Sequence, residues 1–216
     1  MNATATSMIV LHYTKFKDNS IVLHTISREY GRRSFLVSVG KSTPMALFLP
    51  LNILQAEVLE SPRTSLWRAH AFTPVHTLTG LRSSMSKNAI AMFISEVLYR
   101  VVREESGEPG LYEWCESQIL ELDALEGDFS NFHLRWLLEL ASALGFAPSV
   151  EGLMPFVGSD LAAVRALLEG SPADAMLLPL NGVTRSRIAE SILRYFSFHT
   201  ETDLRIRSLE VLAALR

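Results

Sequence analysis

The sequence has little of several features that would define its class. Its single cysteine, Cys115, excludes an internal disulfide and any metal site built from several thiolates. No apolar run approaches the roughly 18 residues that a transmembrane helix needs; the longest, Met45 to Leu54, is interrupted by Pro50. The first seven residues lack the basic start and apolar stretch of a signal peptide. We therefore expect a cytoplasmic protein.

Charge is unevenly divided along the 216 residues. Residues 1–80 hold eight Lys and Arg against four Asp and Glu, a net charge of +4. Residues 81–216 hold twelve against nineteen, a net charge of −7, so the whole chain carries −3. A basic first part before an acidic second part points toward a polyanionic partner for the first part.

The first eighty residues have the pattern of short strands separated by turns. Phe35, Val37 and Val39 alternate with polar residues, and a period of two indicates a strand with one buried face. Similar alternation, or a short apolar run bounded by turn residues, recurs at intervals. We expect strands over residues 9–13, 21–26, 35–39, 47–60 and 66–72. Five short strands of this kind predict a small barrel or sandwich.

After Pro74 the apolar pattern becomes helical, with Ser86 as a capping residue for the first long helix. Gly145 and Pro148 have the residue types that end a helix, and residues 149–158 resemble a loop. We expect the main helices over residues 86–101, 111–125, 130–144 and 159–169, from 184 past 196, and over 207–215. The change from strands to helices falls near residues 74–86.

No motif for catalysis or metal binding is complete. The chain has no G-x-S-x-G elbow, and none of its six histidines forms an H-x-x-x-H pair. Gly40-Lys41-Ser42 resembles the end of a phosphate-binding loop, but the glycine that this motif needs five residues earlier is Phe35. We predict that the protein is not an enzyme and has no cofactor and no metal. A nucleotide hydrolase that uses Lys41 is the remote alternative.

Basic residues gather near the turns of the predicted barrel, with aromatic residues such as Tyr13 and Phe16 between them. Barrels that bind single strands use cations along the phosphates and aromatic faces against the bases. Ordinary solvated cations, with the aromatic rings in the core, are an equally good reading. The candidate DNA-binding residues are Lys15, Lys17, Arg28, Arg32, Arg33, Lys41 and Arg68.

A second basic group lies near the C-terminus, beside apolar Phe196. Arginine next to an apolar groove suits a peptide with a carboxylate and an aromatic anchor. Cations near helix C-terminal dipoles explain the same residues without a ligand. The candidate peptide-binding residues are Arg194, Phe196, Arg205 and Arg207.

Three segments mark the predicted strands: Lys17-Asp18-Asn19-Ser20-Ile21-Val22, Thr25-Ile26-Ser27-Arg28-Glu29-Tyr30-Gly31 and Leu47-Phe48-Leu49-Pro50-Leu51. Four more fall in the predicted helical part: Ile94 to Arg100, Asn131 to Phe146, Tyr195 to His199 and Leu204 to Leu212. The order of these segments resembles the RecO family of bacterial recombination mediators over nearly the whole chain. The first three resemble the family's first hairpins and its approach to the fourth strand, and the others resemble its helical domain. Many members carry a four-cysteine zinc module, which this sequence lacks.

The resemblance implies an α+β chain, with an OB-fold over residues 1–78 and an all-α helical domain for partner interactions over 79–216. It also implies a non-catalytic mediator that binds single- and double-stranded DNA, anneals complementary strands and helps RecR to load recombinase. The acidic tail of single-stranded-DNA-binding protein would be a partner. The alternative is a scaffold of the same fold that acts through these partners with little direct DNA binding.

Overall fold

The structure is a computed structural model that describes residues 3–41, 43–62, 64–104 and 110–214. The chain forms two compact units. The first comprises Met1–Thr79 with Ser95–Ile119, and the second comprises Gly80–Ile94 with Leu120–Arg216. The domain boundary expected between residues 78 and 79 stays a prediction. The compact units interleave along the chain, because residues 95–119 group with the strands.

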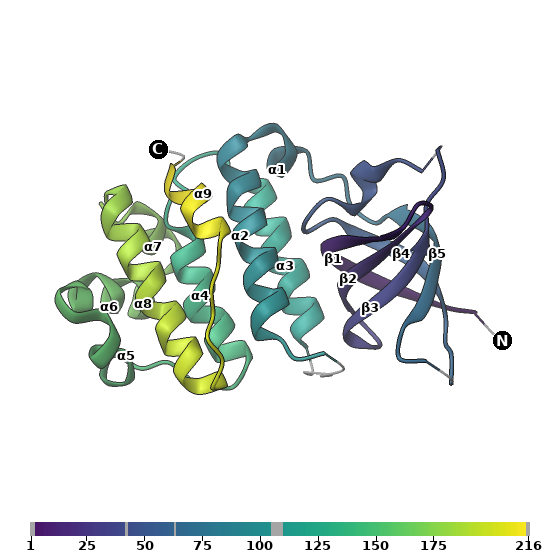
Figure 1. Cartoon of the computed structure of the whole chain (residues 1–216). Coiled ribbons are helices and arrows are strands. Elements are labelled where there is room, and N and C mark those ends of the chain that lie inside the picture. The colour runs from purple at the N-terminus through teal and green to yellow at the C-terminus, as the bar shows by residue number, and fades with distance from the viewer. Residues whose placement is uncertain (1–2, 42, 63, 105–109, 215–216) are drawn as a thin grey trace. The chain divides into compact units, whose positions relative to one another are not determined.

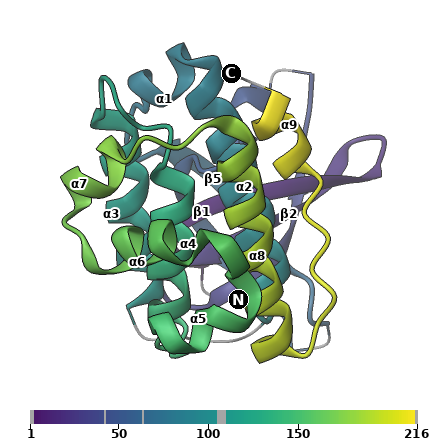
Figure 2. The same ribbon diagram turned by 90° about the vertical axis from the view of Figure 1, so that its left-hand side faces the viewer.

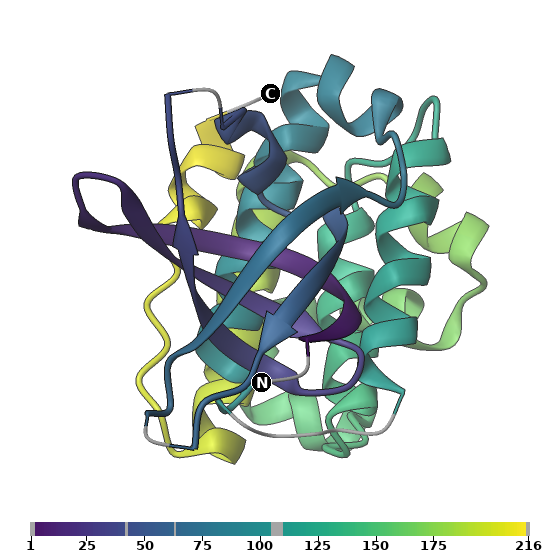
Figure 3. The same cartoon turned by 90° about the vertical axis from the view of Figure 1, so that its right-hand side faces the viewer.

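The first unit contains a closed five-stranded barrel, as Figure 1 and Figure 3 show. Around the barrel the strands follow the order β1-β2-β3-β5-β4, with β4 pairing back to β1. All neighbouring pairs are antiparallel except β3 and β5, which run parallel. This is the five-stranded barrel of the OB-fold. The strands are β1 (Ala3–Lys17), β2 (Ser20–Ser27), β3 (Gly31–Ser38), β4 (Ile53–Leu59) and β5 (Trp67–Pro74).

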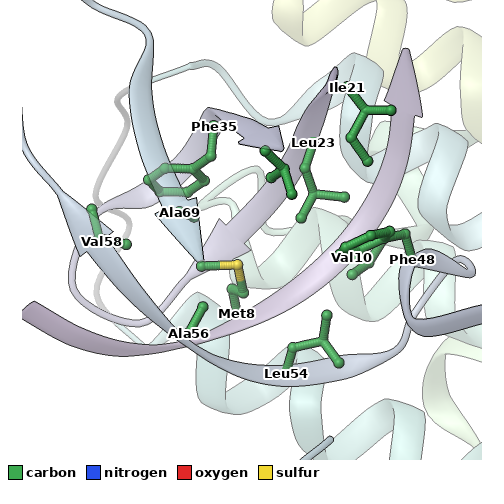
Figure 4. Packing of buried hydrophobic residues seen from close by; sticks show 11 residues of the cluster. Met8, Val10, Ile21, Leu23, Phe35, Phe48, Leu54, Ala56, Val58 and Ala69 are labelled. Atoms are coloured by element: carbon green, nitrogen blue, oxygen red, sulfur yellow. The ribbon is translucent and has the colours of Figure 1, made fainter. Parts of the chain in front are cut away.

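The core of the barrel follows from the period of two along its strands. Met8 and Val10 on β1 point inward with Leu23 on β2 and Phe35 on β3, as Figure 4 shows. All four are fully buried. Phe48 closes the core, with its ring edge-on to Phe72 at 5.2 Å between centroids.

The prediction of a strand beginning at Leu47 is wrong. Residues Met45–Phe48 form a short 3-10 helix, η1, and the strand starts at Ile53. Asn52 explains the bend, because its Nδ2 donates to the carbonyls of Ala46 and Leu47 at 2.9 Å. Phe48 and Leu51 are buried here without a strand, whereas Leu49 is 41% exposed, so the segment does not have the single buried face of a strand.

The second unit is helical, and Figure 2 shows its α5 to α9 facing the viewer. It includes α1 (Thr79–Ser83), the first part of α2 (Met85–Val101) and the end of α3 (Leu111–Ala124). α4 packs against α8 in its interior. None of the helices among the described residues is long and apolar enough to cross a membrane. The remaining elements are α4 (Phe132–Ala143), α5 (Val150–Val157), η2 (Gly158–Asp160), α6 (Leu161–Glu169), α7 (Pro172–Leu177), α8 (Gly182–Thr200) and α9 (Ser208–Ala214).

The loop expected over residues 149–158 is instead a helix, α5. The Ser149 side chain caps it by accepting a hydrogen bond from the Gly152 amide, and Val150, Leu153 and Val157 are buried. A cap and this apolar spacing favour a helix, and the single Pro155 near its end does not prevent one.

Candidate nucleic-acid interface

The β1–β2 hairpin carries cations and aromatic rings into solvent at one end of the barrel. Figure 3 shows this hairpin, in purple, standing out from the barrel. Lys15 and Lys17 are exposed, and Tyr13 and Phe16 expose 43% and 51% of their surface. The Lys17 ammonium lies 5.4 Å from the Phe16 ring centroid. Rings of this exposure are available for stacking, because the core is built without them.

Lys41 follows β3 and lies near the same hairpin. The Val39 amide donates to the Asn19 carbonyl at 3.0 Å, which ties the end of β3 to the hairpin turn. The Gly40 amide donates to Thr43 Oγ1 at 2.9 Å, so the loop is folded on itself. Lys41 is exposed there. Ser42, the third residue of the Gly-Lys-Ser sequence, lies outside the described residues.

Arg68 projects from the outer face of the barrel. It pairs with Leu36 on β3, which pairs with Val22 on β2. Val22 in turn pairs with Thr14 on β1, so these four side chains form one row across the sheet. Arg68 is exposed. Lys15, Lys17, Lys41 and Arg68 form no ion pair among the described residues, and their charges face solvent.

Arg28 has a different environment, because acidic residues of α3 surround it. Its Nε lies 3.2 Å from Glu113 Oε1, and its Nη2 lies 3.1 Å from Glu116 Oε2. The guanidinium also stands 4.7 Å from the Tyr112 ring centroid. The two carboxylates neutralise the charge of Arg28 within its own unit.

Arg32 lies on β3 and is almost fully buried, with 11% of its side chain exposed. Its guanidinium stacks on Tyr99 of α2 at 4.6 Å from the ring centroid, and Nη1 lies 3.9 Å from Glu104. The neighbouring Arg33 lies over the Trp67 ring at 3.5 Å. Both arginines stack on aromatic rings of the barrel unit, which marks them as packing residues.

A histidine pair that the sequence analysis did not single out lies on the outer face of β1 and β2. The rings of His12 and His24 are 4.3 Å apart, and Tyr99 meets their edges at 4.2 and 5.0 Å. His24 Nδ1 lies 2.9 Å from Ser34 Oγ, which donates to Glu104 at 2.5 Å. The β2–β3 face, where OB-folds commonly bind oligonucleotides, is therefore partly covered by residues of the same unit.

Burial dominates the protonation of this pair. It lowers the pKa of His24 to about 4, with further lowering by the charges of His12 and Arg32, while Glu104 acts in the opposite sense. Burial also lowers the pKa of His12, helped by Arg32 and Arg100. Both rings are therefore neutral near pH 7, and the pair adds no positive charge to the barrel.

The predicted peptide-binding residues have different environments in the helical unit. Phe196 is fully buried in the interior, so its ring presents no surface to a peptide, whereas Phe198 is 69% exposed. Arg194 is exposed and donates to the Phe156 carbonyl, and Arg205 pairs with Asp203 at 3.3 Å. Arg207 is exposed.

Arg194 lines a groove of about 470 Å³ along α8 and the segment before α9. The apolar floor of this groove includes Leu193, Leu204 and Ile206. Three carboxylates also line the groove, so its charge is mixed: Glu190, Asp203 and Glu210.

A closed barrel in this strand order, with a helical unit that follows it, defines an OB-fold protein with an appended helical part. The family model described as Recombination protein O C terminal matches residues 82–152. A DNA repair protein RecO of Bacteroides fragilis is 31% identical over 96% of both chains. One of Phocaeicola vulgatus is 37% identical over 66% of this chain and 61% of its own. The chain therefore belongs to the RecO family, a family of DNA repair proteins.

Proposed function

We propose that this protein binds DNA through the end of its barrel that carries the β1–β2 hairpin. The surface comprises four cations and two aromatic residues and is called the hairpin surface below: Tyr13, Lys15, Phe16, Lys17, Lys41 and Arg68. The observation that carries the proposal is the exposure of Tyr13 and Phe16 beside lysines that have no acidic partner in the part of the chain that the structure describes. Cations of this kind attract phosphates, and exposed rings stack on bases of any sequence.

Membership in the RecO family supports a fuller role for this surface. We infer a mediator of DNA repair and recombination that binds single- and double-stranded DNA and anneals complementary strands. In this role it helps RecR to load recombinase on coated single strands. Arg28, Arg32 and Arg33, which the sequence also suggested as DNA contacts, act in this proposal through the packing of the barrel unit.

A scaffold with little direct DNA binding is the second candidate, and one observation favours it. Glu113 and Glu116 neutralise Arg28, and Glu104 accompanies Arg32, so fewer cations are available than the sequence suggests. Four available cations predict a slope of log K against log salt of about −2.8 on single strands, whereas seven predict about −4.9.

Fluorescence anisotropy of a labelled single-stranded oligonucleotide, titrated with the full chain across salt concentrations, tests the proposal. We expect a slope near −2.8 for the natural sequence. Lys15→Glu/Lys17→Glu should flatten the slope and weaken binding to all sequences alike. The matched control, Arg165→Glu/Arg205→Glu, makes the same change of charge at exposed positions of the helical unit. It should leave the salt slope and the affinity for the oligonucleotide unchanged.

The outcomes separate the two candidates. If both double variants lost the same affinity for the oligonucleotide, net charge rather than the hairpin surface would govern binding. No binding at low salt would overturn the DNA proposal and support the scaffold. A slope near −4.9 would return Arg28, Arg32 and Arg33 to the set of phosphate contacts.

We also propose that Arg194, Arg205 and Arg207 contact the acidic tail of single-stranded-DNA-binding protein, with exposed Phe198 in place of buried Phe196 as the aromatic contact. The measurement is the affinity of a labelled acidic peptide that ends in phenylalanine. Reversing the charge of the three arginines should weaken it at least tenfold. Unchanged affinity would refute the contact.

A further inference from the structure

A cavity of about 150 Å³ lies in the helical unit, where the N-terminal parts of three helices converge. Ser86 contributes from the first turn of α2, Ser130 from the residue before the α4 cap, and Gly182 and Ser186 from the start of α8. α9 covers one side through Leu209. In Figure 1, α2 and α8 begin at the same end of this unit, beside α9.

The cavity has a positive electrostatic character. Helix N-termini carry partial positive charge and amide hydrogens that lack partners within the helix. The start of α8 is well formed, because Asn181 Oδ1 accepts from the Thr184 amide at 2.9 Å. Arg185 of the same turn also lines the cavity. Among its described lining residues there are three serine hydroxyls and no carboxylate.

His133 supplies a second, independent observation at this cavity. It lines the cavity and is 97% buried, and its Nδ1 has no hydrogen-bond partner of normal geometry. Burial, together with the charge of Arg185, lowers the pKa of His133 to about 3, and the nearby Ser130 carbonyl acts in the opposite sense. A buried ring nitrogen without a partner is costly unless water or a ligand satisfies it.

We propose that this cavity binds a phosphate group, either free or as the ester of a small molecule. Ser186 Oγ donates to the Gly182 carbonyl, and Arg185 Nη1 donates to the Leu180 carbonyl. Phosphate offers several acceptor oxygens, which suits the hydroxyls of Ser86 and Ser130, the remaining N–H groups of Arg185 and the amides at the start of α8. Phosphate at this site would place negative charge beside His133 and give its imidazole a polar neighbour. The cavity lies in the helical unit and is separate from the hairpin surface.

The size of the site admits both sources of phosphate. A cavity of about 150 Å³ accommodates the phosphate itself. The adjoining groove of about 470 Å³ shares Ser186 and Leu209 with it and has room for the remainder of a nucleotide. Inorganic phosphate and adenosine 5′-monophosphate therefore serve as the two probes.

Calorimetric titration of the full chain with each probe measures the affinity, with acetate as the probe for a general anion effect. Ser130→Asp places a carboxylate at the exposed edge of the cavity and should weaken phosphate binding at least tenfold. The matched control is Ala162→Asp, which adds the same charge at an exposed position in the first turn of α6. It should bind as the natural sequence does.

A second measurement on the natural sequence does not depend on a variant that folds. Phosphate should shift the ring resonances of His133 and leave those of His70 unchanged, because His70 lies on β5 in the other unit. Tighter binding of adenosine monophosphate than of phosphate would identify the ester as the ligand, and equal affinities would identify the free ion. The proposal is overturned if neither probe binds at millimolar concentration, if acetate binds equally well, or if both variants behave alike.

Discussion

The cations on two sides of the barrel have opposite environments. Arg28 and Arg32 face residues 95–119, where Glu113, Glu116 and Glu104 accompany them and Tyr112 and Tyr99 stack on them. The cations of the hairpin surface have no acidic partner among the described residues and are exposed. The charge available to a polyanion is therefore set by local neutralisation, and the +4 of residues 1–80 does not measure it.

Arg32→Glu should have the largest effect, because it breaks the buried side of this comparison. It would remove the guanidinium from Tyr99 and place a second carboxylate near Glu104. Because only 11% of the side chain at this position is exposed, the new carboxylate would be largely removed from water beside Glu104, and we expect the free energy of unfolding to fall by about 3 kcal/mol or more. Urea denaturation, followed by the tyrosine and tryptophan fluorescence, measures this change.

Lys17→Glu is the matched control for Arg32→Glu, since it makes the same change of charge on the hairpin surface. An exposed substitution of this kind should alter stability by no more than about 0.5 kcal/mol. If the two variants lost equal stability, the distinction between packed and available cations would fail.

The sequence predicted the barrel well, because its determinants are local. The alternation of Phe35 and Val37 defined the inward face of β3, and both side chains are buried. The partners of the arginines were beyond such reasoning, because Arg28 and Glu116 are 88 residues apart in the chain. Glu113 and Glu116 lie on the helix that begins at Leu111, but which cations they meet depends on tertiary packing.

The burial of Phe196 was available from periodicity alone. Ile188, Ile192 and Phe196 recur at the spacing of one helix face, and all three are fully buried. Phe198, two positions later, falls on another face and is exposed. The predicted binding role of Phe196 therefore conflicted with the periodicity of its own helix. Predicting the helix α5 would have required recognising Ser149 as its cap despite the presence of Pro155.

Acidification should destabilise the side of the barrel where the cations are packed, because burial there makes the His12–His24 pair harder to protonate. The pKa of His24 is lowered to about 4, so between pH 6.5 and 4 the unfolded chain binds a proton that the folded chain does not. Its contribution to stability is complete above about pH 6.5 and is lost as the pH falls. With solvent screening of its exposed edge, we expect a loss of about 1 kcal/mol.

Urea denaturation at several pH values compares the natural sequence with His24→Gln. His133, whose pKa is also lowered, is present in both proteins, so the difference between the two curves isolates the histidine pair. The variant should lose less stability on acidification. Parallel curves would show that the His12–His24 pair does not couple protonation to the folding of the barrel unit.

Arg28→Ala should have the smallest effect on stability, and it tests a cation that is both partly exposed and paired with carboxylates. Arg28 is 45% exposed, although it meets two carboxylates and the Tyr112 ring. Exposed ion pairs contribute little, so the free energy of unfolding should fall by about 0.5 kcal/mol.

Because the charge of Arg28 is already neutralised, the Arg28→Ala variant should bind oligonucleotide with an unchanged salt slope. A slope flatter by about 0.7 would mean that DNA displaces Glu113 and Glu116 from Arg28. The packed side of the barrel would then be a second, conditional part of the nucleic-acid interface.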